Sequence, residues 1–353
     1  MAEKKPIEGY EYKSKEERLS MLKKTAREIN KEHGLDTLHF ANEHPDIERI
    51  PFGFKEFDDL TGGGIPHGNF FTVWGAPGCG KSTLAHMLTA SAQAQGKLVY
   101  YIALEPYDQA RAIQFGVNVD SLMIGQFPKA EQSLDTIIEF SRKRLVDFII
   151  LDSIHSLSPE GEQEDKKGEK SVADDTMALL ARKLSQFFRM AIDPVKRGNV
   201  AVLMIGQTRM NLGGYVVIEK LSGGNALHHY SKGILQMTKG QKADAPTKKK
   251  DTGDLTPGGN TSYETVQIGF DCSVKVNKCQ IEGMATEGTN LHLPYYYDTG
   301  FYLPKHLKEQ IAQEEKEISQ QTKVEETPLP RTQEPKKKRG RPRKESKDES
   351  KQS

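Results

Sequence analysis

Apolar residues follow two alternating patterns from about residue 50 onward. Short apolar runs predict strands, and stretches with apolar residues every three or four positions predict helices. The predicted strands cover 70–74, 98–103, 147–151, 200–205 and 273–277, and the predicted helices cover 81–95, 107–115, 131–144 and 174–192. This alternation indicates an α/β fold with a mostly parallel central sheet and helices on both faces. The almost wholly apolar run 146–151 is typical of a strand that is covered on both sides.

The N-terminal part of the chain is charged and has no such alternation. Residues 1–13 are predicted to be disordered, and 14–33 are predicted to form a helix. Ser14 followed by Glu17 suits a capping box at its start. Its narrow apolar stripe favours docking on a neighbour over full burial.

The pattern changes again toward the C-terminus. Residues 239–262 are predicted to form a long exposed excursion ending in a hairpin tip. The core pattern of 50–305 then stops. We expect a short helix over 307–321 within a charged, mostly disordered tail that covers 306–353.

Composition narrows the class of protein. Apolar residues make up 36% of the chain and charged residues 28%, which allows a core together with polar ends. No apolar run is long enough for a transmembrane helix, and the N-terminus lacks the apolar centre of a signal peptide. Three cysteines without CxxC spacing argue against disulfides or a zinc site. We therefore expect a cytoplasmic protein, in a bacterial or phage-infected host cytosol, without a membrane partner.

The motif with the clearest chemistry follows the first predicted strand. Residues 75–82 fit G-x-x-x-x-G-K-[ST], the phosphate-binding loop of ATPases, in the strand–loop–helix context that the motif needs. The predicted nucleotide contacts there are Gly75, Ala76, Pro77, Gly78, Cys79, Gly80, Lys81, Ser82 and Thr83. Lys81 is expected to reach the β- and γ-phosphates of ATP, and Ser82 to ligate Mg²⁺. The alternative is a glycine-rich turn that fits the motif by chance, but all eight positions match the motif and both flanking segments match the expected strand and helix.

Three polar residues end or follow predicted strands at the edge where parallel sheets bind ligands. Asp152 ends the apolar run 148–151, the Walker B pattern for a carboxylate beside Mg²⁺, although an ordinary turn also gives this pattern. Glu105 could orient and deprotonate the attacking water, or it could only cap the next helix. Gln207 cannot act as a strong base, but its amide can sense a γ-phosphate by hydrogen bonding.

Two segments suit nucleic acid. The glycine-rich stretch 208–225 has the composition of a mobile DNA-contacting loop, or of a plain surface loop. Residues 331–353 carry ten Lys or Arg against four Asp or Glu, a net charge of +6 in a chain whose total is +1. Within 336–344, an AT-hook-like core is formed by Arg339, Gly340, Arg341, Pro342 and Arg343. Its arginines could enter the narrow minor groove of A·T tracts, and a generic polybasic tail would still attract phosphate.

Over roughly 50–300 the chain resembles the RecA family of recombinases, which includes RecA- and UvsX-like proteins. The stretches that carry the resemblance are 57–83, 116–122, 151–154, 179–186, 207–210 and 223–227. The last, GGNAL, is the most discriminating, because few other ATPases carry it at this place. The resemblance implies a RecA-like ATPase core, a homo-oligomeric filament on single-stranded DNA, and strand exchange with double-stranded DNA in recombination and repair. It also implies single-strand-binding and mediator proteins as partners.

The same resemblance implies roles for individual residues. It makes Glu105 the catalytic glutamate, Gln207 the γ-phosphate sensor and Asp108 an adenine contact. Lys278 matches one of two lysines that reach the ATP of a neighbouring subunit. The resemblance makes 157–174 the first DNA loop, and 207–210 and 223–227 bracket the second. The implied DNA contacts are Lys166, Lys167, Arg182, Arg209, Gly223, Gly224 and Asn225. The segment 14–49 would dock on the adjacent subunit as an oligomerisation segment.

The sequence also departs from the family. Val276 stands at the position of the second inter-subunit lysine, and Arg111 replaces an adenine-stacking tyrosine. The turn from strand to helix at Glu105 is one residue shorter than in the family. No stretch of the sequence resembles the globular C-terminal domain that gathers duplex DNA, so the AT-hook-like tail is a candidate substitute. A compact core with such a tail suggests a phage-encoded recombinase.

Two other functions are compatible with the same sequence. The chain could be a recombination mediator that binds ATP, hydrolyses it poorly and loads another recombinase, as the missing lysine would suggest. It could also be a replicative helicase of the DnaB type, whose entry into the phosphate loop is similar. Intact Glu105 and Gln207 and both DNA loops favour a recombinase, and GGNAL argues against the helicase.

Overall fold

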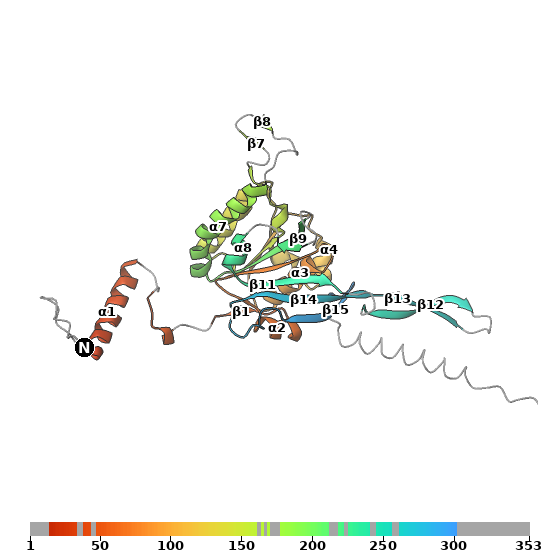
Figure 1. The fold of residues 1–353 in the computed structure, drawn as a ribbon, viewed down its shortest axis with the longest axis horizontal. Coiled ribbons are helices and arrows are strands. Elements are labelled where there is room, and N and C mark those ends of the chain that lie inside the picture. Colours follow the sequence, from red (N-terminus) through yellow and green to blue (C-terminus); the bar gives the residue numbers. More distant parts are fainter. Residues whose placement is uncertain are drawn as a thin grey trace, which may run out of the picture. The chain divides into compact units, whose positions relative to one another are not determined.

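The computed structural model contains a central sheet with helices packed against it (Figure 1). It describes residues 14–33, 38–43, 47–160, 164–165, 168–169, 177–211, 218–221, 225–240, 245–255 and 261–301. Within these residues, nine strands form one sheet in the order β15-β14-β11-β3-β9-β6-β4-β5, with β10 paired to β9. The pairs from β11 to β5 are parallel, and β14 and β15 extend the sheet in antiparallel fashion beyond β11. The predicted α/β class with a mostly parallel sheet is confirmed.

The sheet contains every predicted strand and several that the sequence patterns missed. Its strands are β3 (Phe70–Gly75), β4 (Val99–Ala103), β5 (Leu122–Gly125), β6 (Phe148–Asp152), β9 (Ala201–Asn211), β10 (Ile218–Leu221), β11 (Ser231–Lys239), β14 (Gly269–Cys279) and β15 (Asn290–Tyr296). The missed strands are β5, β10, β11 and β15. Lys232, Gly233 and Gln236 interrupt the apolar pattern of β11, and Pro294 interrupts that of β15, which is an edge strand where proline is tolerated.

The four helices predicted around the sheet are present to within a few residues, apart from one extension, and two short helices, α2 and α8, were not predicted. Around the sheet they are α2 (Lys55–Thr61), α3 (Lys81–Ala94), α4 (Gln109–Gln114), α5 (Ala130–Lys143), α7 (Met177–Gly198) and α8 (Asn225–Tyr230). Helix α4 begins after Asp108, because the Asp108 carboxylate accepts a hydrogen bond from the Arg111 amide at 3.0 Å. Helix α7 passes through Pro194 and continues six residues beyond the predicted end at 192.

Two hydrophobic cores lie on opposite faces of the sheet. Alternate side chains of the same strand enter different cores, as the two-residue period of a strand requires. Phe71 and Val73 pack in one core with Leu84 and Leu88 of α3. Phe70 packs in the other core, with side chains of α5, α7 and α8 such as Ile137, Phe188 and Leu227. Each central strand is therefore buried on both sides.

Helix α1 (Lys15–His33) lies outside these cores and has the predicted capping box. The Glu17 amide donates to Ser14 Oγ at 3.2 Å, and the Ser14 amide donates to Glu17 Oε2 at 2.8 Å. Its apolar side chains Leu19, Met21 and Leu22 are exposed.

Residues 247–266 belong to a separate compact unit. There β12 (Thr247–Leu255) pairs with β13 (Thr261–Gln267), so the hairpin expected over 239–262 exists but begins later in the chain. The remaining short elements are the strand pairs β1 (Arg49–Ile50) with β2 (Ile65–Pro66) and β7 (Glu164–Asp165) with β8 (Gly168–Glu169), and the 3₁₀ turns η1 (Ala41–Glu43), η2 (Val119–Ser121) and η3 (Ile154–Ser156). None of the described helices has both the length and the apolar character that a membrane crossing requires.

Candidate active site

The phosphate loop leaves the middle of the sheet, where β3 lies between β11 and β9. Gly75 ends β3 so close to β11 that a Cβ atom there would lie 1.9 Å from the carbonyl oxygen of Met237. Gly78 and Gly80 have φ values of 71° and 94°, a left-handed conformation that favours glycine. The loop backbone therefore requires glycine at these three positions of the motif.

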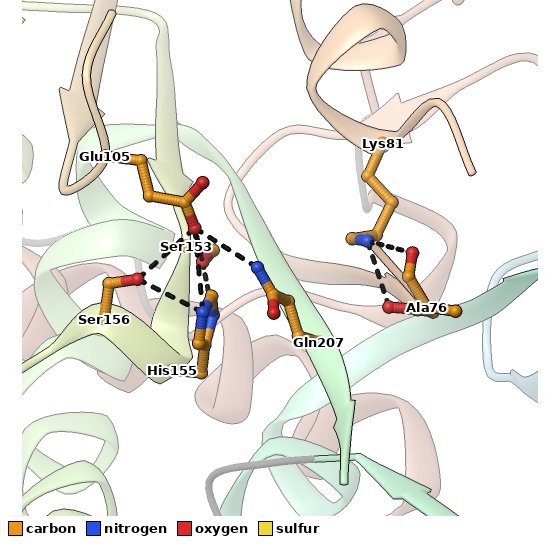
Figure 2. Close-up of polar contacts among 8 residues, drawn as sticks. Ala76, Lys81, Glu105, Ser153, His155, Ser156 and Gln207 are labelled. Atoms are coloured by element: carbon orange, nitrogen blue, oxygen red, sulfur yellow. Dashed lines mark hydrogen bonds and ion pairs between the residues drawn. The ribbon is translucent and has the colours of Figure 1, made fainter. Parts of the chain in front are cut away.

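Lys81 begins α3 and is folded onto the loop that precedes it (Figure 2). Its side chain is buried, and Nζ donates hydrogen bonds to the carbonyls of Gly75 and Ala76 at 3.0 and 2.8 Å. Cys79 is fully buried beneath the loop, and burial raises the pKa of its thiol. The cysteine of the motif is thus a packing residue, while the lysine charge lies at the mouth of the loop.

Asp152 ends β6, two strands away from β3 at the same edge of the sheet. Its carboxylate accepts a hydrogen bond from the buried Tyr101 hydroxyl at 2.7 Å. Burial raises the pKa of Asp152, and hydrogen bonds from Tyr101 and Ser82 oppose that rise. The hydroxyl of Ser82 and the carboxylate of Asp152 therefore lie together. Hard oxygen donors of this kind fit Mg²⁺, which keeps most of its other positions for water and phosphate.

Glu105 follows β4 and has one carboxylate oxygen surrounded by donors (Figure 2). Gln207 Nε2, Ser153 Oγ and Ser156 Oγ donate to Glu105 Oε1 at 3.2, 3.1 and 3.3 Å. His155 Nε2 lies 3.6 Å from the same oxygen. The structure thus brings together the predicted glutamate and the predicted sensor Gln207, whose strand register places it beside Gly75.

Sequence reasoning did not identify Ser153, His155 and Ser156 as members of this group. They come directly after Asp152, and η3 turns them back toward Glu105. The available signal was a run of polar residues immediately after the Walker B strand, where a chain that leaves the sheet must pass the nucleotide edge.

The described pocket around these residues has a volume of about 310 Å³. Its walls are formed by the phosphate loop, by the predicted strands β6 and β9, and by strands β11 and β15, which the sequence patterns did not predict. The lining residues are Pro77, Gly78, Gly80, Lys81, Ser82, Thr83, Glu105, Arg111, Asp152, Ser153, Gln207, Lys239, Phe270, Tyr295 and Tyr297. Lys239 at the end of β11 lies over the Phe270 ring, 4.9 Å from its centroid. Lys239 is exposed and adds a second cation beside the buried Lys81, which the sequence patterns missed together with β11.

Arg111 joins α4 to the phosphate loop. Its guanidinium donates to the Tyr295 hydroxyl at 2.7 Å and to Thr83 Oγ1 at 3.4 Å. The guanidinium also lies 5.2 Å from the centroid of the Phe115 ring. Asp108, the expected adenine contact, caps α4 beside this network.

Lys278 is buried against the end of α8, which the sequence did not indicate. Its side chain is buried, and Nζ donates to the carbonyls of His228 and, at 3.2 Å, His229 at the end of α8. Burial lowers the pKa of this ammonium group. Val276, two residues earlier in β14, is fully buried. Within this chain, Lys278 supports the helix that follows the second predicted DNA loop.

Only part of the predicted DNA-binding set falls within the described residues. Arg182 is exposed on α7, and Asn225 is exposed at the first position of α8. Arg209 lies in β9, opposite Lys220 of β10, but its side chain lies outside the description. Lys166, Lys167, Gly223, Gly224 and the AT-hook-like residues 339–343 lie outside the described residues.

Comparison with known proteins gives two further findings. A sequence model of the RecA N-terminal domain matches residues 20–254. Protein RecA of a Nitratiruptor species is 36% identical to the chain over 189 residues, which are 52% of this chain and 54% of that protein. The chain therefore matches about half the length of this curated relative.

Proposed function

The chain belongs to the RecA family, and from this premise we propose that it is a DNA-dependent ATPase that forms filaments on single-stranded DNA and promotes homologous pairing and strand exchange. The observation that carries the proposal is the meeting of Lys81, Asp152, Glu105 and Gln207 around one pocket at the carboxyl edge of the sheet. This is the arrangement that phosphoryl transfer needs: cationic, acidic and sensing groups from separate elements around one phosphate position.

ATP is the proposed substrate, with Mg²⁺ as cofactor. Backbone amides of 76–82 would receive the phosphates, and the ammonium group of Lys81 would move from the loop carbonyls to the β- and γ-oxygens. Ser82 and Asp152 would hold Mg²⁺, which when bound neutralises charge on the phosphates. Arg111 and Tyr295 line the pocket and would contact the base and ribose, beside the proposed adenine contact Asp108.

Glu105 is the proposed general base. Its carboxylate would take a proton from a water molecule, whose oxygen forms a bond to the γ-phosphorus as the bond to the β-phosphate oxygen breaks. Gln207 would donate a hydrogen bond to the γ-phosphate in exchange for its bond to Glu105. Because Gln207 lies on β9 and β9 continues into the second DNA loop, this exchange would report the nucleotide state to DNA.

The DNA-binding surface is proposed from the position of the two loops. The first lies between β6 and α7, and the second, 208–225, leads from β9 to α8. Lys166, Lys167, Arg182, Arg209, Gly223, Gly224 and Asn225 are the proposed contacts. The exposed apolar side chains of α1 would dock on an adjacent subunit, and the tail residues 339–343 would hold duplex DNA. DNA repair is the proposed pathway, in the cytoplasm, with single-strand-binding and mediator proteins as partners.

One observation favours a second candidate, a mediator with little strand exchange. Val276 is buried, and Lys278 is bound to the carbonyls of α8, so neither is presented outward by this chain. A subunit without an outward lysine would contribute less to hydrolysis at a neighbour. The two candidates differ in turnover and in strand exchange, not in nucleotide binding.

The experiment is ATP hydrolysis with and without single-stranded DNA, followed in the same samples by D-loop formation. Strong stimulation by DNA together with D-loops supports the recombinase. DNA binding with little hydrolysis and no D-loops supports the mediator. Lys81→Ala is expected to abolish ATP-dependent filaments, and Glu105→Gln to trap an ATP-bound filament. Parental hydrolysis by Glu105→Gln would refute the assignment of the base.

A further inference from the structure

Three neighbouring residues of the Walker B segment converge on one oxygen of Glu105. Ser153 and Ser156 donate to Oε1, and the His155 ring lies between the two hydroxyl groups (Figure 2). His155 Nδ1 is 2.5 Å from Ser153 Oγ, and Nε2 is 3.3 Å from Ser156 Oγ. One imidazole therefore contacts both hydroxyl donors of the proposed catalytic carboxylate.

The ring constrains where the serine hydroxyl hydrogens point. Each serine has a single hydroxyl hydrogen, and the bond to Glu105 uses it. A ring nitrogen that faces such a serine must then donate its own N–H to the serine oxygen. A neutral ring supports one serine in this way and a doubly protonated ring supports both. In either state, an N–H of the His155 ring fixes at least one serine hydroxyl on Glu105.

The ring is held on a rigid support. It lies on η3, directly after β6, and its neighbours Ile154 and Leu157 are buried in the core shared with α5 and α7. The His155 side chain is 28% exposed and the Glu105 side chain 48% exposed. Within the described part of the chain, the hydrogen bonds of the Glu105 carboxylate all go to Oε1, which leaves Oε2 without a protein donor there.

We propose that His155 is a positioning residue for Glu105: it aligns the hydroxyls of Ser153 and Ser156 so that they hold Oε1 and keep Oε2 turned toward the attacking water. This inference rests on the proposed role of Glu105 as the base. A carboxylate tethered at one oxygen loses the rotations that would take its other oxygen out of line with the water. Such alignment contributes to the rate of the chemical step but little to nucleotide binding.

The test compares His155→Ala, His155→Asn and His155→Gln in the full chain, by steady-state ATP hydrolysis on single-stranded DNA. His155→Ala is expected to lower kcat about tenfold or more, with KM changed by less than about twofold. Asn and Gln each restore an amide donor, near the Nδ1 and Nε2 positions respectively. At least one of them is expected to recover most of the loss. His292→Ala removes another histidine paired with a carboxylate, Asp271 at 2.9 Å, and is the matched control, because neither residue lines the pocket.

A second comparison separates positioning from a merely structural effect. In a Glu105→Gln background the base is absent, so His155→Ala is expected to cause no further loss of the residual rate. The proposal is overturned if the losses multiply, if neither Asn nor Gln restores kcat, or if His155→Ala leaves kcat unchanged. If His155→Ala does not fold, the Asn and Gln variants together with Ser156→Ala give the same comparison, with a loss of at least about threefold in kcat expected for Ser156→Ala. Parental activity of Glu105→Gln alone would instead refute the proposed function.

Discussion

His86 should make the folded state sensitive to acid. It is 4% exposed on α3 and stacks on Tyr101, with ring centroids 5.6 Å apart. Within the described residues its Nδ1 atom has no hydrogen-bond partner. Burial, aided by the nearby charge of Arg111, lowers the pKa of His86 from 6.5 to about 4, against a smaller opposing effect of Asp108. The folded protein therefore keeps this imidazole neutral.

The sign and size of the effect follow from proton binding. Between the two pKa values the unfolded chain binds a proton that the folded protein does not, so stability falls as the pH falls through this window. The contribution is fully present above about pH 6.5. At about 1.4 kcal/mol per pKa unit, this difference corresponds to about 3 kcal/mol, lost progressively down to about pH 4. His86→Phe keeps an aromatic ring there and removes the titration.

Urea unfolding of the parent and His86→Phe at about pH 7 and about pH 4.5 measures the difference. The parent is expected to lose about 2 kcal/mol more than the variant over this interval. Comparing the change with pH, not the absolute stability, removes any repacking cost of the larger ring. Buried carboxyls such as Asp152 titrate in both proteins and cancel. Parallel pH dependences for the two proteins would refute the reasoning.

Three further predictions concern the loop, a buried lysine and the N-terminal helix. Gly75→Ala places a Cβ 1.9 Å from the Met237 carbonyl, so it should cost about 1–3 kcal/mol of stability and weaken nucleotide binding; parental values in urea unfolding and nucleotide titration would contradict this. Lys278→Met removes a charged donor from the carbonyls of His228 and His229 and should cost about 2 kcal/mol in urea unfolding, because bonds to charged groups contribute about 1.5–3 kcal/mol while the buried ammonium is itself penalised. A loss of hydrolysis in that variant without loss of stability would instead indicate a role at a neighbouring subunit. Ser14→Ala removes the cap of α1, worth about 1 kcal/mol, and should accelerate amide hydrogen exchange in the first turn about fivefold; unchanged exchange would show that the cap contributes nothing.

The sequence predicted those parts of the fold whose patterns arise from burial on two faces. Strands β3 and β6 and the first part of β9, 201–205, are largely apolar because helices cover both of their sides, and the phosphate loop follows from a motif tied to that setting. Strand β11 occupies an equally central place but contains Lys232, Gly233 and Gln236. Gly233 is needed there because a Cβ would meet Phe71, 2.3 Å away. Local packing requirements of this kind do not produce a periodic signal.

The site residues could be predicted only where a residue type and its position in a motif or after a strand indicate one chemical role. Lys81 and Asp152 belong to recognisable motifs and Glu105 follows a recognisable strand, and the structure places all three on one pocket. The serine–histidine group beside Glu105 depends on how η3 turns, and the burial of Lys278 depends on where α8 ends. Both depend on the direction that the chain takes where an element ends, and residue types alone do not specify that direction.

Strand β9 has a thermodynamic consequence. It carries Gln207 at the nucleotide pocket and continues to Asn211, where it pairs with β10. If nucleotide binds near Gln207 and DNA binds at the loop after β9, both ligands change the conformation of the same strand. Their binding free energies are then coupled, and the coupling is reciprocal. DNA must then tighten ATP binding by the same factor by which ATP tightens DNA binding. ATP affinity measured without DNA would then understate the affinity in the assembled state by that factor.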